Sequence, residues 1–330
     1  MKKAKNTGGG EKKIVNWSEY NASLLERGKP SLFMEFEELK AEWYSKEKRV
    51  GKGKSVKYAD KAIETMHIVS EAYNLPYRQT EGFLIYMFKA NNIELEVPDY
   101  TMMSKRGEDL NHRIKIGKEK IRALKERGEK ICIAIDSTGV KIYGENEWKV
   151  RTHGKGTRRK WKKLHAIIDI HSRQIIAAEL TGNDVHDSQV FDKLLKQAMQ
   201  SVEEVEAFYG DGAYHPHAII ERLEALDIEP MIPLPKNAVI GGESKDECMR
   251  VTKARDKLLL RQYDAGGTES WKKATDYHLR SMVENLFSRM KRIFGERMRQ
   301  KHDNIRILRA DIRMSILNMF AAICLPKYAK

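Results

Sequence analysis

Cysteine is scarce in this chain, and the few cysteines lie far apart. Cys132, Cys248 and Cys324 are the only three among 330 residues, and no two of them form a CxxC pair. This spacing excludes a disulfide framework and a zinc finger, and it favours a protein of the reducing cytosol.

Long apolar runs are also missing. The longest, residues 315–325, contains Asn318 and is far too short to cross ~30 Å of hydrocarbon. The basic N-terminus has no apolar stretch of the kind found in a secretory signal. With a mean hydropathy of −0.61, the composition excludes a membrane protein and a fully disordered chain.

Acidic residues are too few to balance the basic ones. The 61 lysines and arginines outnumber the 47 acidic residues, which gives a net charge of +14 and a pI near 9.4. This balance indicates a polyanionic partner, most simply nucleic acid, although an ordinary basic cytosolic protein is the alternative. The length is sufficient for about two domains with a substantial core.

Three segments differ in their residue patterns. Residues 1–57 begin as a basic tail with three consecutive glycines, which we expect to be disordered, and continue as a charged, partly helical arm. Residues 58–128 have helical periodicity and end in a charged linker helix. Residues 129–330 carry strand patterns that then alternate with helices, which is typical of a mixed α/β domain.

The helical segment predicts three short helices and then the linker helix. They cover residues 58–73, 77–89, 100–106 and 112–129. Asp99 is a suitable N-cap for the third helix. Ser104, Lys105 and Arg106 lie on that helix, where a helix-turn-helix protein would present them to DNA. A plain helical bundle is the alternative, because the loop before the third helix is longer than a tight turn.

Short apolar runs in the last segment predict strands. The expected strands are residues 131–135 with an extension at 140–143, then 148–152, 164–170, 174–180, 205–209 and 228–233, with helices at 187–199, 217–226 and 305–325. This order predicts a mixed sheet flanked by helices.

Two aspartates close strand patterns. Asp136 follows residues 131–135, and Asp211 follows residues 205–209 between two glycines that leave room for phosphate. Ligands of open α/β sheets bind beyond the carboxyl ends of strands. Two neighbouring carboxylates need a cation between them, and Mg²⁺ takes such oxygen ligands together with phosphate. Either aspartate taken alone is better explained as a turn residue or a helix cap.

Residues 277–294 predict one long helix with a polar stripe. At 100° per residue, Tyr277, Arg280, Glu284 and Lys291 fall within about 60°, next to an apolar face. That face consists of Val283, Phe287, Met290 and Phe294. A carboxylate and two cations at the rim of a core are costly unless they have a use. The alternative is a surface helix with an Arg280–Glu284 salt bridge.

These residues resemble the catalytic motifs of insertion-sequence transposases. Asp136, Asp211 and Glu284 resemble the DDE triad, and Tyr277-x2-Arg280-x3-Glu284-x6-Lys291 is similar to the Y-R-E-K motif at every position. The N-terminal strings RQTEGF (78–83) and VPDYTMMSKR (97–106) resemble the family-five group of these enzymes. So do the catalytic strings GKGTRRKWKKLH (154–165), GDGAYH (210–215) and WKKATDYHLRSMVENLFSRMKRIFG (271–295). The resemblance covers about residues 58–325.

The resemblance implies a ribonuclease-H-like mixed-sheet catalytic domain preceded by an all-α helix-turn-helix-like DNA-binding domain. It implies that Asp136, Asp211 and Glu284 are catalytic and bind two Mg²⁺ ions, with Mn²⁺ able to substitute. The implied protein binds the terminal inverted repeats of an insertion sequence, hydrolyses the ends and joins their 3′-hydroxyls to target DNA. It would act as a homodimer or higher oligomer on double-stranded DNA, without a membrane partner, in the cytoplasm and on the nucleoid.

Further DNA contacts are expected from the motif and from a basic run. The resemblance implies that Arg280 and Lys291 hold DNA phosphates and that Tyr277 positions DNA near the break. Residues 151–163 carry seven basic residues and no acidic one, and a solvated hairpin is the alternative to phosphate binding. The candidates for phosphate contact in this run are Arg158, Arg159, Lys160, Lys162 and Lys163.

Two other functions stay open at this point. One is a metal-dependent nuclease of the same fold that cuts without joining strands, because carboxylates and metal serve both reactions. The other is a non-catalytic DNA-binding protein derived from a transposase. The helical N-terminal segment favours the transposase, and the presence of all three acidic residues opposes the non-catalytic protein.

Overall fold

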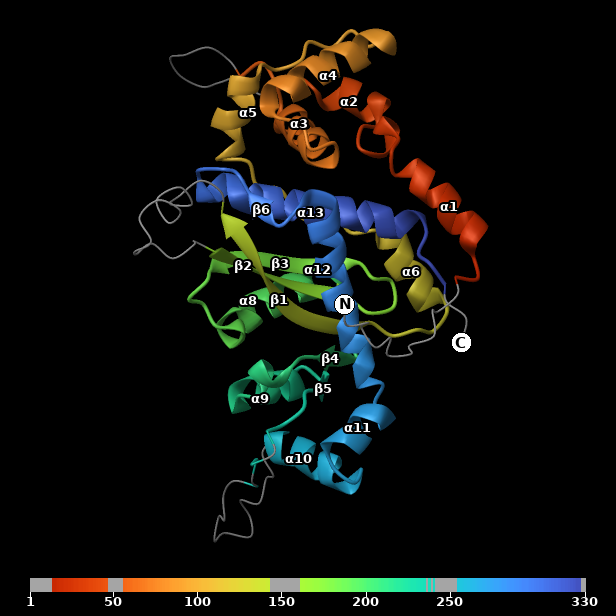
Figure 1. The fold of residues 1–330 in the computed structure, drawn as a ribbon, viewed down its shortest axis with the longest axis vertical. Helices are drawn as coiled ribbons and strands as arrows, with labels where there is room; N and C mark the ends of the chain where they lie inside the picture. The colour runs from red at the N-terminus through yellow and green to blue at the C-terminus, as the bar shows by residue number, and fades with distance from the viewer. Residues whose placement is uncertain are drawn as a thin grey trace, which may run out of the picture.

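A central mixed sheet carries helices on both faces, and a group of N-terminal helices lies above it (Figure 1). The computed structural model describes residues 14–46, 56–142, 161–235, 237, 238, 240 and 254–327. No helix within these ranges is long and apolar enough to cross a membrane.

The sheet combines antiparallel and parallel pairs in the order β3-β2-β1-β4-β5. β1, β2 and β3 form an antiparallel meander, β4 and β6 run parallel to β1, and β5 runs parallel to β4. The strands are β1 (Cys132–Ile142), β2 (Trp161–Asp169), β3 (Ile175–Gly182), β4 (Ala207–Tyr209), β5 (Glu229–Met231) and β6 (Arg297–Met298). This confirms the predicted α/β class, a mixed sheet flanked by helices. The strand expected at 148–152 lies outside the described residues.

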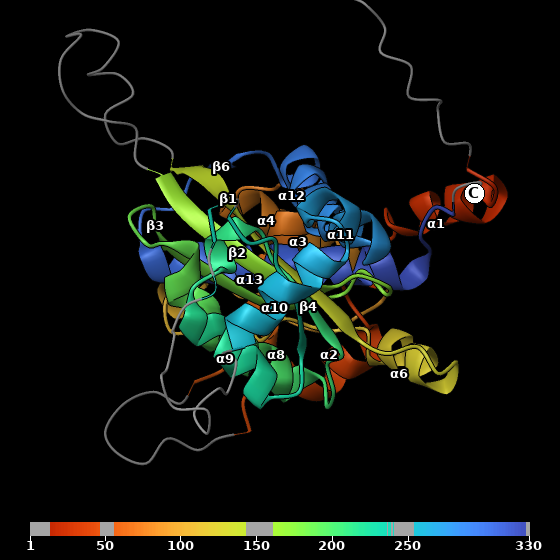
Figure 2. The same ribbon diagram turned by 90° about the horizontal axis from the view of Figure 1, so that it is seen from below.

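Alternate residues of β1 face two different cores, as the two-residue period of a strand requires. Ile133 and Ile135 face the first core, formed with α6 (Lys118–Glu126), α8 (Phe191–Ser201), α9 (His217–Ala225), α10 (Ala254–Asp264) and α11 (Thr268–Ala274). Ala134 faces the second core, formed with α12 (Ser281–Phe294) and α13 (Asp303–Ile323). Figure 2 shows α8 and α9 on the other side of the strands from α12.

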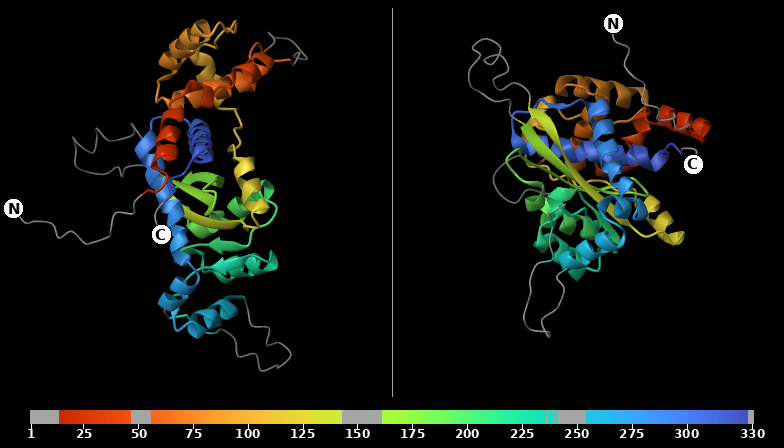
Figure 3. Two further views of the ribbon diagram at one scale, coloured as in Figure 1. Left: turned by 90° about the vertical axis from the view of Figure 1, so that its right-hand side faces the viewer. Right: turned by 60° about the horizontal axis from the view of Figure 1, so that its bottom comes forward.

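The N-terminal helices share a third core with α13. These helices are α2 (Phe36–Glu42), α3 (Asp60–Ala72), α4 (Tyr77–Ala90) and α5 (Tyr100–Gly107), whereas α1 (Trp17–Glu26) contacts α13 outside this core. Leu39 and Trp43 from the N-terminal arm pack in this core together with Met66 of α3 and Ile312 of α13. α13 therefore lies between the N-terminal helices and the sheet (Figures 1 and 3).

Local patterns placed most of these elements correctly. The Asp99 carboxylate caps α5 by accepting from the amides of Thr101 and Met102, as predicted for an N-cap. The charged helix expected over 112–129 is shorter than predicted and forms α6 only. The helix expected at 305–325 forms as α13, and it packs on the sheet and on the N-terminal helices alike.

Candidate active site

Asp136 lies in the middle of β1, so the prediction that it ends its strand is wrong. The strand continues because β2 pairs with it over nearly its whole length, up to Lys141. The parallel partner β4 is much shorter. It pairs Tyr209, its last residue, with Ala134. Asp136 lies two residues after Ala134, and Asp211 lies two residues after Tyr209. Asp136 is therefore just past the carboxyl end of β4. The register brings the two aspartates to one level.

Asp211 begins the short 3₁₀ turn of residues 212–214. Its Oδ1 accepts a hydrogen bond from the amide of Ala213 at 2.8 Å, so the capping role expected of an isolated aspartate is present. A Cβ atom at Gly210 would come within 2.9 Å of Phe208 and 3.0 Å of Tyr214. Close packing of these two rings accounts for glycine at position 210, whereas position 212 faces open space.

Arg280 joins two of the three acidic residues. Its Nη1 donates to Asp136 Oδ2 at 3.0 Å, and its Nη2 donates to Glu284 Oε1. The side chains of Arg280 and Asp136 are each 19% exposed, whereas Glu284 is 52% exposed. Residues 144 positions apart in the sequence thus meet at one guanidinium. The Arg280–Glu284 pair expected for a surface helix is present, and Asp136 is a further partner that local spacing does not reveal.

The predicted helix over 277–294 begins as a 3₁₀ turn (Tyr277–Arg280) before α12 starts at Ser281. The tighter winding of a 3₁₀ turn breaks the 100° periodicity, so Tyr277 does not belong to the same stripe as Glu284. Its hydroxyl donates to the carbonyl of Gly210 at 2.9 Å, and burial raises the pKa of Tyr277 to about 12. The apolar face of α12 is as predicted, because Val283, Phe287 and Met290 are buried.

The carboxylates lie in a setting that favours a cation. Burial raises the pKa of Asp136, and the nearby Asp211 carboxylate raises it further, while the Ser137 amide and Arg280 oppose the rise. Arg280 supplies positive charge between Asp136 and Glu284. In the described residues no three acidic, histidine or cysteine side chains converge closely enough to hold a metal ion. The donor set of oxygen atoms fits Mg²⁺ or Mn²⁺, and binding there requires Arg280 to release a carboxylate.

A polar network beside Asp136 was not predicted as part of the site. Asp187 Oδ1 lies 2.8 Å from Lys163 Nζ and 3.1 Å from His165 Nδ1, and it also interacts with the hydroxyl of Ser137. Burial alone would raise the pKa of Asp187, but hydrogen bonds from His165, Lys163 and Ser137 lower it well below its usual range. The sequence pattern placed Asp187 only at the start of the helix expected at 187–199. Its partners come from β1 and β2, which no local pattern links to residue 187.

The other predicted DNA contacts lie in different surroundings. Lys162 pairs with Asp303 at 2.8 Å, whereas Lys291 has no ion-pair partner in the described part of the chain. Ser104 and Lys105 are exposed on α5. Arg106 binds the carbonyl of Tyr58 and the carboxylate of Asp60, so it holds α5 against α3. Arg158, Arg159 and Lys160 lie outside the described residues.

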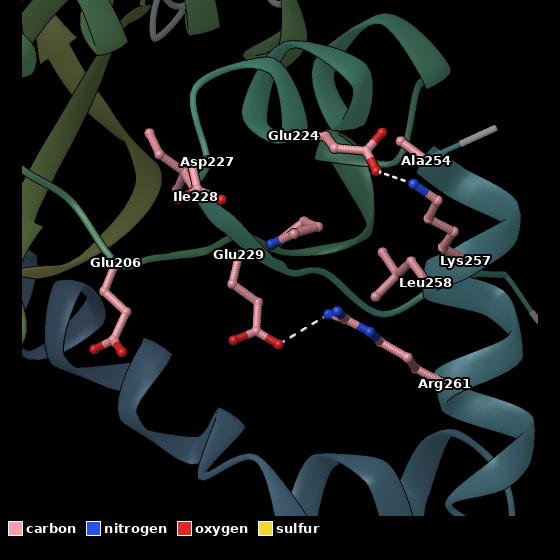
Figure 4. A pocket seen from close by; sticks show the side chains of 10 residues that line it. Glu206, Glu224, Asp227, Ile228, Glu229, Ala254, Lys257, Leu258 and Arg261 are labelled. Atoms are coloured by element: carbon pink, nitrogen blue, oxygen red, sulfur yellow. Dashed lines mark hydrogen bonds and ion pairs between the residues drawn. The ribbon is translucent and has the colours of Figure 1, made fainter. Parts of the chain in front are cut away.

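A separate cavity of about 400 Å³ lies at the amino-terminal ends of β4 and β5 (Figure 4). Glu206 precedes β4 and Glu229 begins β5, so this cavity adjoins the amino ends of strands whose carboxyl ends point to Asp211. Two ion pairs, Glu224–Lys257 and Glu229–Arg261, span it at 2.5 and 2.9 Å. It does not include any of the predicted catalytic residues.

Comparison with known proteins gives one consistent family. A family model described as transposase DDE domain matches residues 127–319, and a second model with that description matches residues 25–145. Similar solved structures include a piggyBac transposase synaptic complex with hairpin DNA, at 9% identity over 95% of this chain and 77% of that one, with a TM-score of 0.38. The Mos1 strand transfer complex is 15% identical over 86% of this chain and 83% of that one, with a TM-score of 0.27.

Proposed function

The chain belongs to the transposase DDE domain family, and we propose that it cleaves and joins DNA with Asp136, Asp211 and Glu284. The observation that carries this proposal is the meeting of Asp136 and Glu284 at Arg280, beside Asp211 at the end of β4. Three elements far apart in the sequence contribute one acidic group each. The substrates are double-stranded element ends and then target DNA, and the protein acts as a homodimer or higher oligomer on them.

The three carboxylates would hold two Mg²⁺ ions, or Mn²⁺ in their place, which supply an activated attacking oxygen and stabilise the leaving oxygen. Before that, Arg280 keeps the negative charges of Asp136 and Glu284 compensated. Once it releases them, its guanidinium is free to bind a DNA phosphate in the same place. Tyr277 holds the start of the catalytic helix against the end of β4 through Gly210. Lys291, on the same helix as Glu284, adds a second cation for the DNA backbone.

Substitution of the carboxylates tests this proposal. Asp136→Asn, Asp211→Asn and Glu284→Gln should each abolish cleavage of end-bearing duplexes in Mg²⁺ or Mn²⁺, with DNA affinity largely kept, because affinity comes mostly from phosphate contacts. Asp192→Asn, on the exposed start of α8, is the matched control and should cleave normally. Strong metal-dependent cleavage by any of the first three variants would remove that residue from the catalytic set.

The products distinguish the proposed function from a nuclease. A labelled element end with a free 3′-hydroxyl should become covalently joined to an unlabelled target duplex. Cleavage without a joined product would instead identify a nuclease of the same fold, and binding without cleavage would identify a non-catalytic DNA-binding protein.

A further inference from the structure

A second charged site lies between the N-terminal helices and the catalytic sheet. Two adjoining cavities, of about 580 and 280 Å³, share Arg299, Gln300 and Arg309, and we call them together the junction cleft. One wall comes from residues 71–77 at the end of α3 and the start of α4, and the other from the ends of β1 and α12 and from α13. The cations that line it are Lys141, Arg297, Arg299, Lys301, Arg309 and Arg313.

Cations clearly outnumber carboxylates in this cleft. Its two acidic residues are Glu71 and Glu296. Glu71 is occupied by Arg309 and Arg313, and Glu296 pairs with Lys141 at 2.6 Å. Arg299 and Lys301 are exposed, and within the described ranges neither has a carboxylate partner. Positive charge is therefore left over, and it faces solvent where an anion can reach it.

Two buried features of the walls also favour an anion. Arg313 is only 5% exposed, yet its Nη1 has no hydrogen-bond acceptor among the described residues. The 14-residue helix α4 starts at the cleft after Pro76, and no side chain caps its N-terminus. Its free amides carry partial positive charge. The C-terminus of α12 contributes the opposite sign, about half a charge, which the surplus cations outweigh.

The cleft lies at a defined distance from the catalytic carboxylates. β1 carries both Asp136 and Lys141, five residues apart, which is roughly 16 Å along a strand. α12 carries Glu284 and ends at Phe294, ten residues later, which is roughly 15 Å along a helix. Two independent elements thus give the same separation. Along duplex DNA it corresponds to about four to five base-pair steps of 3.4 Å.

The cleft also connects with the helix predicted to read DNA. Ser104 of α5 lines the smaller cavity together with Tyr77 of α4 and Lys301. A duplex that extends from the catalytic carboxylates toward the exposed face of α5 therefore passes over the cleft.

We propose that the junction cleft binds a backbone phosphate of the DNA substrate, about four to five base pairs from the phosphate that is cut. Arg299 and Lys301 make the contact at the surface. The buried Arg313 and the amides at the start of α4 add positive charge beneath it. This inference rests on the proposed function, because it takes the substrate to be duplex DNA. The shared ligand chemistry is a phosphate group, from DNA or from free phosphate.

Equilibrium binding of a labelled end-bearing duplex to full-length protein tests the proposal. The measurement uses Asp136→Asn protein, so that binding is followed without cleavage, at several salt concentrations. Adding Arg299→Ala and Lys301→Ala together should lower the slope of log affinity against log salt by about 0.9, since the two side chains neutralise one duplex phosphate. Arg222→Ala, an exposed arginine of α9 on another face, should leave the slope unchanged. An unchanged slope in the double variant, with an unchanged melting temperature, would overturn the proposal.

Neutral methylphosphonate linkages locate the contact. Placed four or five steps from the cleavage position, they should weaken binding to the parent protein and have no further effect on the double variant. Equal weakening in both proteins would overturn the assignment. Inorganic phosphate should compete only weakly with the duplex for the cleft. If phosphate binds the cleft but the double substitution leaves DNA affinity and its salt slope unchanged, the cleft is a site for free anions instead. If the double substitution lowers the salt slope as expected and wild-type protein still does not cut DNA, the catalytic proposal fails while the cleft assignment stands.

Discussion

Replacing Glu71 with glutamine removes the negative charge that links the N-terminal helices to α13. Glu71, Arg309 and Arg313 are 6%, 7% and 5% exposed, so this ion-pair triad is buried. Each carboxylate oxygen binds one guanidinium, with distances of 2.5 Å to Arg309 Nε and 2.8 Å to Arg313 Nε. The substitution leaves two buried cations without a counter-charge, which costs about 3–5 kcal/mol.

The expected loss can be measured as a change in melting temperature. At about 2 °C per kcal/mol for a large chain, Glu71→Gln should lower the melting temperature by roughly 6–10 °C. Glu224→Gln is the control, because Glu224 and Lys257 form an exposed pair, 44% and 51% accessible, and such pairs contribute little. Glu71→Gln within 2 °C of the parent protein would refute the view that this triad holds the two parts together.

The pH dependence provides a second test of the same contact. Burial would raise the pKa of Glu71, but Arg309 and Arg313 lower it below the usual value. A lowered pKa in the folded state means that the stabilisation is present above the unfolded pKa of about 4.3 and is lost as the pH falls through the folded pKa. The difference in melting temperature between the parent and Glu71→Gln should therefore be largest near neutral pH and shrink in acid. A constant difference down to pH 3 would contradict this reasoning.

Lys291→Ala should lower the slope of log DNA affinity against log salt by about 0.9 and leave the melting temperature unchanged, because Lys291 has no ion pair in the described structure. Arg280→Ala should lower the melting temperature as well, since Asp136 loses its partner. An unchanged slope for Lys291→Ala would reject its DNA contact. Burial, with the nearby Glu179 carboxylate, raises the pKa of Asp311 to about 7, so its folded state retains a proton that the unfolded chain loses near pH 4. Stability should then fall by up to about 1.4 kcal/mol per pH unit between pH 4 and 7, and Asp311→Asn should remove that fall in denaturation curves; identical pH profiles would contradict it. Tyr277→Phe should destabilise the protein by about 1 kcal/mol through the lost bond to Gly210, visible as a lower urea midpoint, and no shift would show that the bond contributes nothing.

Patterns that repeat over a few residues were sufficient to predict most helices and strands. The apolar residues Val283, Phe287 and Met290 recur at helical spacing, and all three are buried. Asp99 precedes an apolar-polar repeat, and it caps α5 as a local hydrogen bond requires. Such features depend on backbone geometry within one or two turns, which neighbouring residues alone determine.

Residue motifs also predicted which side chains are chemically suited to a metal-dependent site. Asp136, Asp211 and Glu284 were proposed from their motifs, and two family models match the same chain. Their arrangement was not predictable in this way. That β1 runs on past Asp136 depends on pairing with β2, which begins 25 residues later at Trp161.

Which charged side chains meet depends on how distant parts of the chain pack together. Arg280 donates a hydrogen bond to Asp136, 144 residues away in the sequence. Asp187 pairs with Lys163 and His165 of β2. Likewise, α13 packs in two cores at once, and its arginines line a cleft together with helices from the other end of the chain. The physical reason is that packing of distant apolar surfaces sets these positions, and burial then gives each charge a partner that sequence spacing does not encode.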